Sequence, residues 1–265
     1  MAIIARAQGT AHCHPMAQSI TPEIVFFALL GGLLPAIFWL WFWLKEDSVH
    51  PEPRGLIILS FLVGMLATAS AYPIEKWIAT HMSGGNLNLL FFWAATEETL
   101  KFLGIYIVAL RSKYFDEPID AVVYFMTIAL GFAALENTMF LINPLTGGEN
   151  MSAFLLGNFR FIGATLLHVA ASGMIGVILA LTFYKDRVTR ELAGLAGLVG
   201  AILLHTLFNF SIIKTEGSYI YEIFIVLWVF ILGLLLICER IKRMAPRSHV
   251  EYANTGTIFL PHNIS

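Results

Sequence analysis

The sequence is poor in charge. Only 13% of its 265 residues are Asp, Glu, Lys or Arg, whereas ordinary soluble domains carry about 25%. The formal net charge is -2, so no basic surface for nucleic acid is indicated. Instead, 58% of the residues are hydrophobic and the mean hydropathy is +0.76. This composition excludes a soluble domain and predicts a protein embedded in the lipid bilayer, without a nucleic-acid partner.

Cysteine is nearly absent as well, with only Cys13 and Cys238 in the chain. The topology predicted below places them on opposite sides of the membrane, so no intrachain disulfide is expected. A cleavable secretory signal is not evident, because Met1 to Thr21 lacks a continuous apolar core followed by a small-residue cleavage site. We therefore expect the first membrane helix to be retained.

Long apolar runs recur seven times along the chain, each of about the 20 residues that a membrane helix needs. They cover approximately residues 24–44, 55–74, 89–110, 119–142, 161–184, 192–213 and 219–238. The sequence therefore predicts an all-α fold, a polytopic membrane helical bundle of about seven transmembrane helices. Residues 143–153 contain Pro144, Gly147 and Gly148 and are expected to form a loop between the fourth and fifth helices.

Lysine and arginine divide unevenly between alternate loops. One set of loops holds Lys45, Arg54, Arg111, Lys113, Lys185, Arg187, Arg190, Arg240, Lys242, Arg243 and Arg247, and the other holds Arg6, Lys76, Arg160 and Lys214. By the positive-inside rule we expect a multi-pass plasma-membrane protein with its amino terminus outside and its carboxyl terminus in the cytoplasm. The predicted organisation is a polar arm at residues 1–22, a transmembrane helical domain at 23–243 and a disordered cytoplasmic tail at 244–265.

The third apolar run contains three charged residues, Glu97, Glu98 and Lys101. Ionisable side chains are unfavourable in lipid, so they suggest function by default. The lysine follows the two carboxylates by four and three residues and can therefore neutralise whichever one faces it. Adjacent helical residues point about 100° apart, so the spacing does not decide which glutamate faces a cavity.

Further polar residues recur in the next three apolar runs. They are Glu136, Asn137, His168, His205 and Asn209. Counted from the outer end of each helix at about 1.5 Å per residue, Glu97, Glu136 and the two histidines all lie roughly 9 to 14 Å deep. The sequence therefore predicts that four helices bring polar groups to one layer of the membrane.

Such a layer can activate water for hydrolysis. A glutamate can act as general base, while imidazole and carboxamide groups orient the water or stabilise a developing oxyanion. Two histidines with one or two glutamates are also a plausible zinc set, with a remaining glutamate as the base. Two other classes stay open: an ion or proton transporter, and a catalytically silent membrane binding protein with a buried polar network. A transporter predicts ionisable groups spread through the full depth of the membrane.

The polar residues form an ordered set of motifs. In chain order they are Glu97-Glu98-x-x-Lys101, Asp116-Glu117-Pro118-Ile119-Asp120, Gly131-Phe132-Ala133-Ala134-Leu135-Glu136-Asn137, His168 and His205-x-x-x-Asn209. This set resembles the PrsW family of intramembrane proteases, which is similar to the type II CAAX prenyl endopeptidases. The resemblance implies a membrane-embedded peptidase, a hydrolase that cuts a membrane-anchored protein. It also suggests first-site cleavage of an anti-sigma factor.

The resemblance implies roles by position. Glu97 would activate water, Glu136 would help to hold that water, and His205 with Asn209 would support the oxyanion. The CAAX-type enzymes have a histidine at the position of Glu136, so this chain departs from their pattern there, and it adds His168.

That departure leaves the cofactor open. Glu136, His168 and His205 could bind zinc with Glu97 or Glu98 as the base, and a metal-free site is the other version. Lys101 and Asn137 are expected to support the site in either case. The acidic residues of the second motif, Asp116, Glu117 and Asp120, are expected to interact with nearby basic residues or to cap the fourth helix, which Pro118 would start.

Overall fold

The computed structural model describes residues 19–46, 52–82 and 85–244, and this part of the chain is helical without strands. The elements are α1 (Pro22–Glu46), α2 (Arg54–His81), α3 (Asn86–Val108), α4 (Pro118–Thr146), α5 (Asn150–Phe159), η2 (Arg160–Ala164), α6 (Thr165–Leu181), α7 (Arg187–Lys214) and α8 (Ile220–Ile241). Because α5, η2 and α6 follow one another without a break, they form one rod. The predicted all-α class and seven-helix bundle are confirmed. The predicted arm and tail lie almost wholly outside the described residues.

Six of the seven rods in the described part of the chain are long and apolar enough to cross a membrane. The seventh is α3, a helix of 23 residues. Its charged residues Glu97, Glu98 and Lys101 lie near the middle, so every stretch of 18 residues contains all three. The helix that composition disqualifies is therefore the one that carries the first polar motif.

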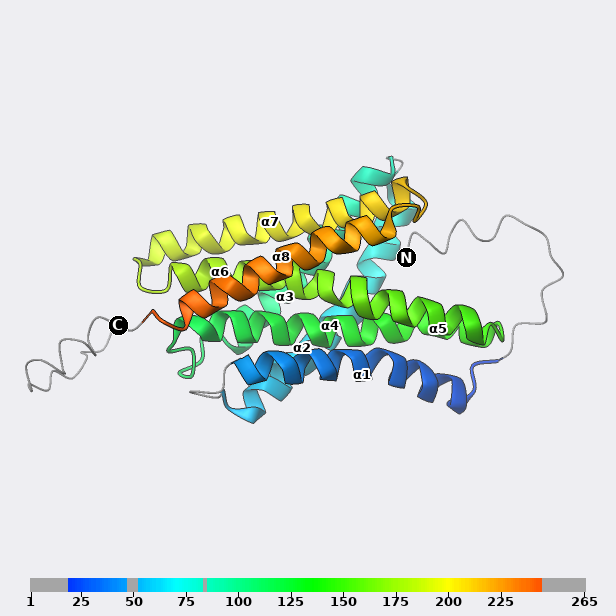
Figure 1. Cartoon of the computed structure of the whole chain (residues 1–265), viewed down its shortest axis with the longest axis horizontal. Helices are drawn as coiled ribbons and strands as arrows, with labels where there is room; N and C mark the ends of the chain where they lie inside the picture. Colours follow the sequence, from blue (N-terminus) through cyan, green and yellow to red (C-terminus); the bar gives the residue numbers. More distant parts are fainter. Residues whose placement is uncertain (1–18, 47–51, 83–84, 245–265) are drawn as a thin grey trace, which may run out of the picture.

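The central helix of the bundle is α4. Its most apolar stretch is 94% buried, against 22% for α1 and for α8. Figure 1 shows α4 between α1 on one side and α6 with α8 on the other, while α2 crosses the bundle obliquely. A Cβ added at Gly131 would meet the backbone of Phe61, and one added at Gly64 would meet the backbone of Ile128. Glycine at the crossing therefore lets the backbones of α2 and α4 pack closely.

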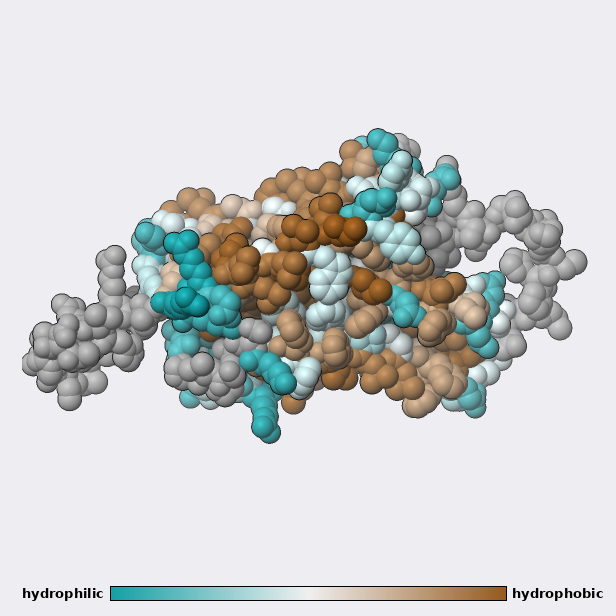
Figure 2. All heavy atoms as spheres, in the orientation of Figure 1, coloured by the Kyte–Doolittle hydropathy of each residue, from teal (hydrophilic) through white to brown (hydrophobic). Residues whose placement is uncertain are grey.

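The surface of the bundle suits a bilayer. Figure 2 shows apolar side chains over the middle of the visible face and polar side chains gathered toward its two ends. The start of α1 and the end of α8 lie at opposite ends of the bundle, as an odd number of crossings requires (Figure 1). The chain is thus a membrane protein, and which end faces the cytoplasm stays a prediction.

The connection between α4 and α5 is shorter than expected. α4 continues through Pro144, and only residues 147–149 link it to α5, so the predicted loop at 143–153 is wrong. Gly148 makes the turn with a φ of 72°, in the left-handed region that glycine adopts readily. Pro144 removes only one backbone hydrogen bond, and its neighbours stay packed against α1 and α5. The helix therefore continues through this residue.

The start of α4 follows the prediction closely. Pro118 is in the first turn, and Glu117 and Asp120 form a capping box. The Asp120 Oδ2 atom accepts hydrogen bonds from the backbone N–H groups of Asp116 at 2.9 Å and Glu117 at 2.7 Å. The expected capping role of this acidic motif is confirmed.

Candidate active site

The two adjacent glutamates of α3 have different surroundings. Glu98 is fully buried, and its Oε1 atom lies 2.8 Å from both Lys101 Nζ and His205 Nδ1. Its Oε2 atom accepts a longer hydrogen bond, 3.5 Å, from the hydroxyl of Ser172. Because a carboxylate only accepts hydrogen bonds, His205 donates from Nδ1, and its Nε2 atom lies 3.9 Å from Glu97 Oε2. Both oxygens of Glu98 are therefore occupied.

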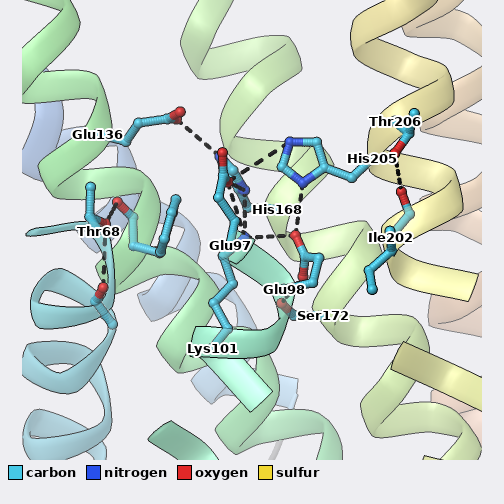
Figure 3. A network of polar contacts seen from close by, with 12 residues as sticks. Thr68, Glu97, Glu98, Lys101, Glu136, His168, Ser172, Ile202, His205 and Thr206 are labelled. Carbon is cyan, nitrogen blue, oxygen red and sulfur yellow. Dashed lines mark hydrogen bonds and ion pairs between the residues drawn. The ribbon is translucent and has the colours of Figure 1, made fainter. Parts of the chain in front are cut away.

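Glu97 instead lines a cavity and carries an oxygen with no partner. Its Oε2 atom is buried and has no hydrogen-bond partner among the described residues. The same atom lies 3.8 Å from Lys101 Nζ and 3.9 Å from both His168 Nδ1 and His205 Nε2. Figure 3 shows the Glu97 side chain pointing between Glu136 and the two imidazole rings. Of the two glutamates, Glu97 thus faces the cavity.

His168 links α3 to the centre of the bundle. Its Nδ1 atom accepts a hydrogen bond from Lys101 Nζ at 2.8 Å, so its Nε2 atom carries the proton. That Nε2 atom lies 3.0 Å from Glu136 Oε2 on α4. The Lys101 ammonium also lies 4.1 Å from the centre of the Phe132 ring, a cation–π distance. Lys101 therefore neutralises the α3 carboxylates from below in the view of Figure 3, and Glu136 orients the His168 ring from above.

Four side chains of the site could hold a metal ion. Glu97, Glu98, His168 and His205, called the Glu97 cluster below, each offer one ligand atom, and these atoms lie within 4.8 Å of one another. Buried imidazole nitrogens and carboxylate oxygens are the donors that zinc prefers. The expected ligand set of Glu136, His168 and His205 differs from this group. The structure places Glu136 outside the group because Arg160 and His168 hold its carboxylate.

The remaining expected residues lie at the edge of the site. Asn209 is partly exposed and lines the cavity one turn after His205. Asn137 is buried, donates to the Thr165 hydroxyl at 2.9 Å and accepts from Arg160 Nε at 2.5 Å. Asn137 thus supports the position of Arg160 rather than contacting the Glu97 cluster.

The cavity beside the cluster is large and mostly apolar. Its volume is about 380 Å³, and the seven helices α2 to α8 line it together with η2. Its aromatic lining comprises Tyr72, Trp93, Phe132, Phe140, Phe159, Phe208 and Phe224. Such a space matches the concave, largely apolar sites that bind organic ligands and polypeptide segments.

Arg160 is a site residue that sequence reasoning missed. It starts the η2 segment, a π-helical turn of a kind often found at functional sites. Its guanidinium group forms an ion pair with Glu136 and lies 3.8 Å from the centre of the Phe140 ring. The residue was counted with a loop because the fifth helix was expected to start at Phe161, whereas the rod starts at Asn150. The apolar residues before Arg160 were the signal for the longer helix.

Glu75 was missed for a similar reason. The second helix was expected to end at residue 74 after Pro73, but α2 runs on to His81. Glu75 is therefore inside a helix, 9% exposed, and lines the same cavity as Glu97.

Comparisons with known proteins point to one family. The family model described as PrsW family intramembrane metalloprotease matches residues 52–236. The chain is similar to Protease PrsW of Bacillus subtilis (strain 168), with 29% identity over 203 residues that cover 74% of this chain and 87% of that protein. It is also similar to Protease PrsW of Oceanobacillus iheyensis, with 29% identity over 206 residues, 76% of this chain and 91% of that protein. No solved structure shows a significant match.

Proposed function

Since the chain belongs to the PrsW family of intramembrane metalloproteases, we propose that it hydrolyses a peptide bond of a membrane-anchored protein at the Glu97 cluster. A protease of this family is a membrane hydrolase. The observation that carries it is the Glu97 carboxylate: one buried oxygen without a partner, two imidazoles 3.9 Å away and an adjoining cavity.

Glu97 is the base of the proposed reaction. Its free oxygen lines the cavity and can accept a proton from a water molecule that attacks the scissile carbonyl. Glu98 is less suited to this role because Lys101 and His205 already occupy it. The same carboxyl group can later return the proton to the leaving amine, which completes hydrolysis without net proton transfer.

The Glu97 cluster also suits a zinc ion. His168 Nδ1 and His205 Nε2 would supply the nitrogen ligands and Glu98 a carboxylate oxygen, which leaves Glu97 to act as the base. The Lys101 ammonium, which donates to His168 Nδ1 and Glu98 Oε1, would have to move off His168 Nδ1 for the ion to bind there. A bound zinc ion would supply Lewis acidity to the water and to the scissile carbonyl. Lys101 contributes a positive charge that balances the carboxylates in apolar surroundings.

Glu136 and Arg160 are positioning residues in this scheme. Glu136 accepts the Nε2 proton of His168 and so fixes both the tautomer and the orientation of the ring. Arg160 holds the Glu136 carboxylate in turn. Asn209 lines the cavity, where its carboxamide can donate to the developing oxyanion, the role that the family resemblance implies.

The distribution of charge favours hydrolysis over transport. Between Asp120 and Glu136, the central helix α4 has no acidic or basic side chain. A proton or ion path through the membrane needs polar groups along its whole length. The charged residues well inside the bundle instead gather around one cavity: Glu75, Glu97, Glu136 and Arg160 line it, and Glu98 and Lys101 contact this group. The more specific substrate, an anti-sigma factor cut at a first site, stays a prediction.

The test is cleavage of a membrane-anchored substrate by the purified protein in proteoliposomes, with zinc content measured on the same samples. We expect Glu97→Gln to lower kcat at least 100-fold while the protein keeps its zinc. We expect Glu98→Gln to lose zinc and activity together. A chelator should abolish cleavage by the parent, and added zinc should restore it. Glu222→Gln, at an exposed position in the first turn of α8, is the matched control.

Two results would contradict the assignment. Undiminished cleavage by folded Glu97→Gln would remove that residue as the base. Full activity of a parent protein that contains no zinc and resists chelators would remove the metal and leave the glutamate-only version.

A further inference from the structure

One side of α2 forms a wall of the cavity. Thr68, Ala71, Tyr72 and Glu75 line it, and their spacing of three, four and seven residues places them on one face of the helix. The facing residues on α3 include Trp93 and Glu97. Helix α2 thus contributes a continuous surface to the active-site cavity, and we call these four residues the α2 wall.

Glu75 is the charged residue of the α2 wall. Its Oε1 atom is buried and has no hydrogen-bond partner in the described part of the chain. Its carboxyl group is within hydrogen-bonding reach of the Glu97 carboxyl group. The Trp93 indole N–H donates to the Glu75 carbonyl oxygen at 3.1 Å, which fixes α2 against α3 at this level. A buried carboxylate oxygen without a donor is unfavourable. The Glu97 carboxyl group can donate to Glu75 only while it carries a proton, so with both carboxylates ionised this geometry calls for a donor from whatever fills the cavity.

A membrane-spanning substrate brings such donors. In lipid, each backbone N–H of a helix is bonded to a carbonyl oxygen four residues earlier, since there is no water to replace it. The scissile carbonyl must leave its helical hydrogen bond before water can attack it, and nearby N–H groups are then released as well. Most of the cavity surface is apolar, and its acceptors are the polar side chains of its lining, Glu75 and Asn209 among them. The protein must therefore supply acceptors close to Glu97.

We propose that Glu75 accepts a hydrogen bond from a backbone N–H of the unwound substrate segment, and that this segment lies along the α2 wall. The inference rests on the proposed function, because it takes the cavity to be the site of peptide hydrolysis. Glu75 is thereby a substrate-binding residue that selects peptide segments able to leave the helical conformation near the cut.

Two substitutions separate acceptor from acid. Glu75→Gln keeps a carbonyl oxygen of nearly the same position, whereas Glu75→Leu fills the space without an acceptor. We expect Glu75→Leu to raise KM about tenfold and Glu75→Gln to raise it threefold or less, with kcat within threefold of the parent in both. Glu222→Leu, at an exposed site, should leave both constants unchanged. A large loss of kcat in Glu75→Gln at unchanged KM would overturn the proposal, because it would make Glu75 a proton partner of Glu97.

The donor can be removed from the substrate as well. Replacing one peptide bond at a time by an ester in the residues that flank the cut removes a single N–H at each position. At one position, the ester should weaken cleavage by the parent about tenfold and cause no further loss of cleavage by Glu75→Leu. If the parent and Glu75→Leu lose equally at every position, no substrate N–H is bonded to Glu75 and the proposal fails.

Binding without cleavage distinguishes this inference from the proposed function. In a Glu97→Gln background, affinity for a fluorescent membrane-spanning peptide is measured with and without Glu75→Leu in proteoliposomes. We expect about tenfold weaker binding with Glu75→Leu, even if the parent cleaves nothing. Equal binding by two proteins that thermal unfolding shows to be folded would overturn the role of Glu75, whether or not the parent is a peptidase.

Discussion

Asp120 and Glu136 are acidic residues of the same central helix, and their carboxylates are held in different ways. Asp120 lies in the first turn of α4, and Glu136 lies ten residues before its end. Asp120 is 1% exposed and accepts two backbone N–H groups from residues three and four positions earlier. The Glu136 side chain is 20% exposed and is held by Arg160 and His168, which lie 24 and 32 residues later in the chain. Asp120 thus completes a cap and also contacts Glu52 ahead of α2, away from the cavity, whereas Glu136 joins two later segments beside the cavity. The partners of a buried carboxylate, more than its burial, separate a structural role from a functional one.

Substituting each carboxylate by its amide should give the largest difference in activity between the two positions. We expect Glu136→Gln to lower kcat at least 100-fold with little change in thermal stability, because the amide neither balances Arg160 nor fixes His168 as the carboxylate does. Asp120→Asn should instead lower the unfolding temperature, while the folded protein stays within threefold of parental activity. Initial rates in proteoliposomes, normalised to folded protein, measure both effects. A hundredfold loss of activity in folded Asp120→Asn would show that the two carboxylates act together.

A smaller effect is expected at Arg160. In Arg160→Lys, an ammonium group can still neutralise Glu136 but cannot reach Glu136 and Asn137 as the guanidinium fork does. We expect about a tenfold loss of kcat with KM nearly unchanged. Arg187→Lys is the matched control, since its pair with Glu191 is exposed on both sides and should alter the rate less than twofold. A change in KM alone would instead assign Arg160 to substrate binding.

The smallest effect should come from the capping box. Replacing the carboxylate in Glu117→Ala removes its hydrogen bond to the first turn of α4. The free energy of unfolding should fall by about 1 kcal/mol, a typical value for a lost cap. Specific activity of the folded protein should stay within twofold, measured together with reversible unfolding in detergent. Loss of activity without loss of stability would contradict the structural role of this end.

The helices could be predicted from the sequence because each apolar run reports its own environment. The same holds for Glu136, His168 and His205, since polar residues in an apolar run stand out wherever the helix packs. Glu75 and Arg160 did not stand out, because each lies close to residues that often end helices. For Arg160 the preceding apolar residues carried a signal for a longer helix, whereas its pairing with Glu136 depends on packing against α4. The helical position of Glu75 depends on packing against α3, which local sequence does not report.

Adjacent residues presented a second limit. The spacing of Glu97 and Glu98 allowed either one to face a cavity, and hydropathy gave no preference. The distinction arises from α7, because His205 reaches Glu98 across 107 residues and leaves Glu97 toward the open side. A contact of that separation belongs to the tertiary structure alone.

The π-helical turn at Arg160–Ala164 has a consequence for the rod that contains it. The Thr165 N–H bonds to the Arg160 carbonyl, so this turn holds one residue more than an α-helical turn. One extra residue rotates everything before it by about 100° relative to α6. The side chains before and after the turn therefore have different angular positions around the axis of the rod. Those of α6 face α4 for packing, and the segment before α6 is turned so that Arg160 points at Glu136. Deleting a single residue here would turn the guanidinium away from Glu136 while every contact of α6 remained.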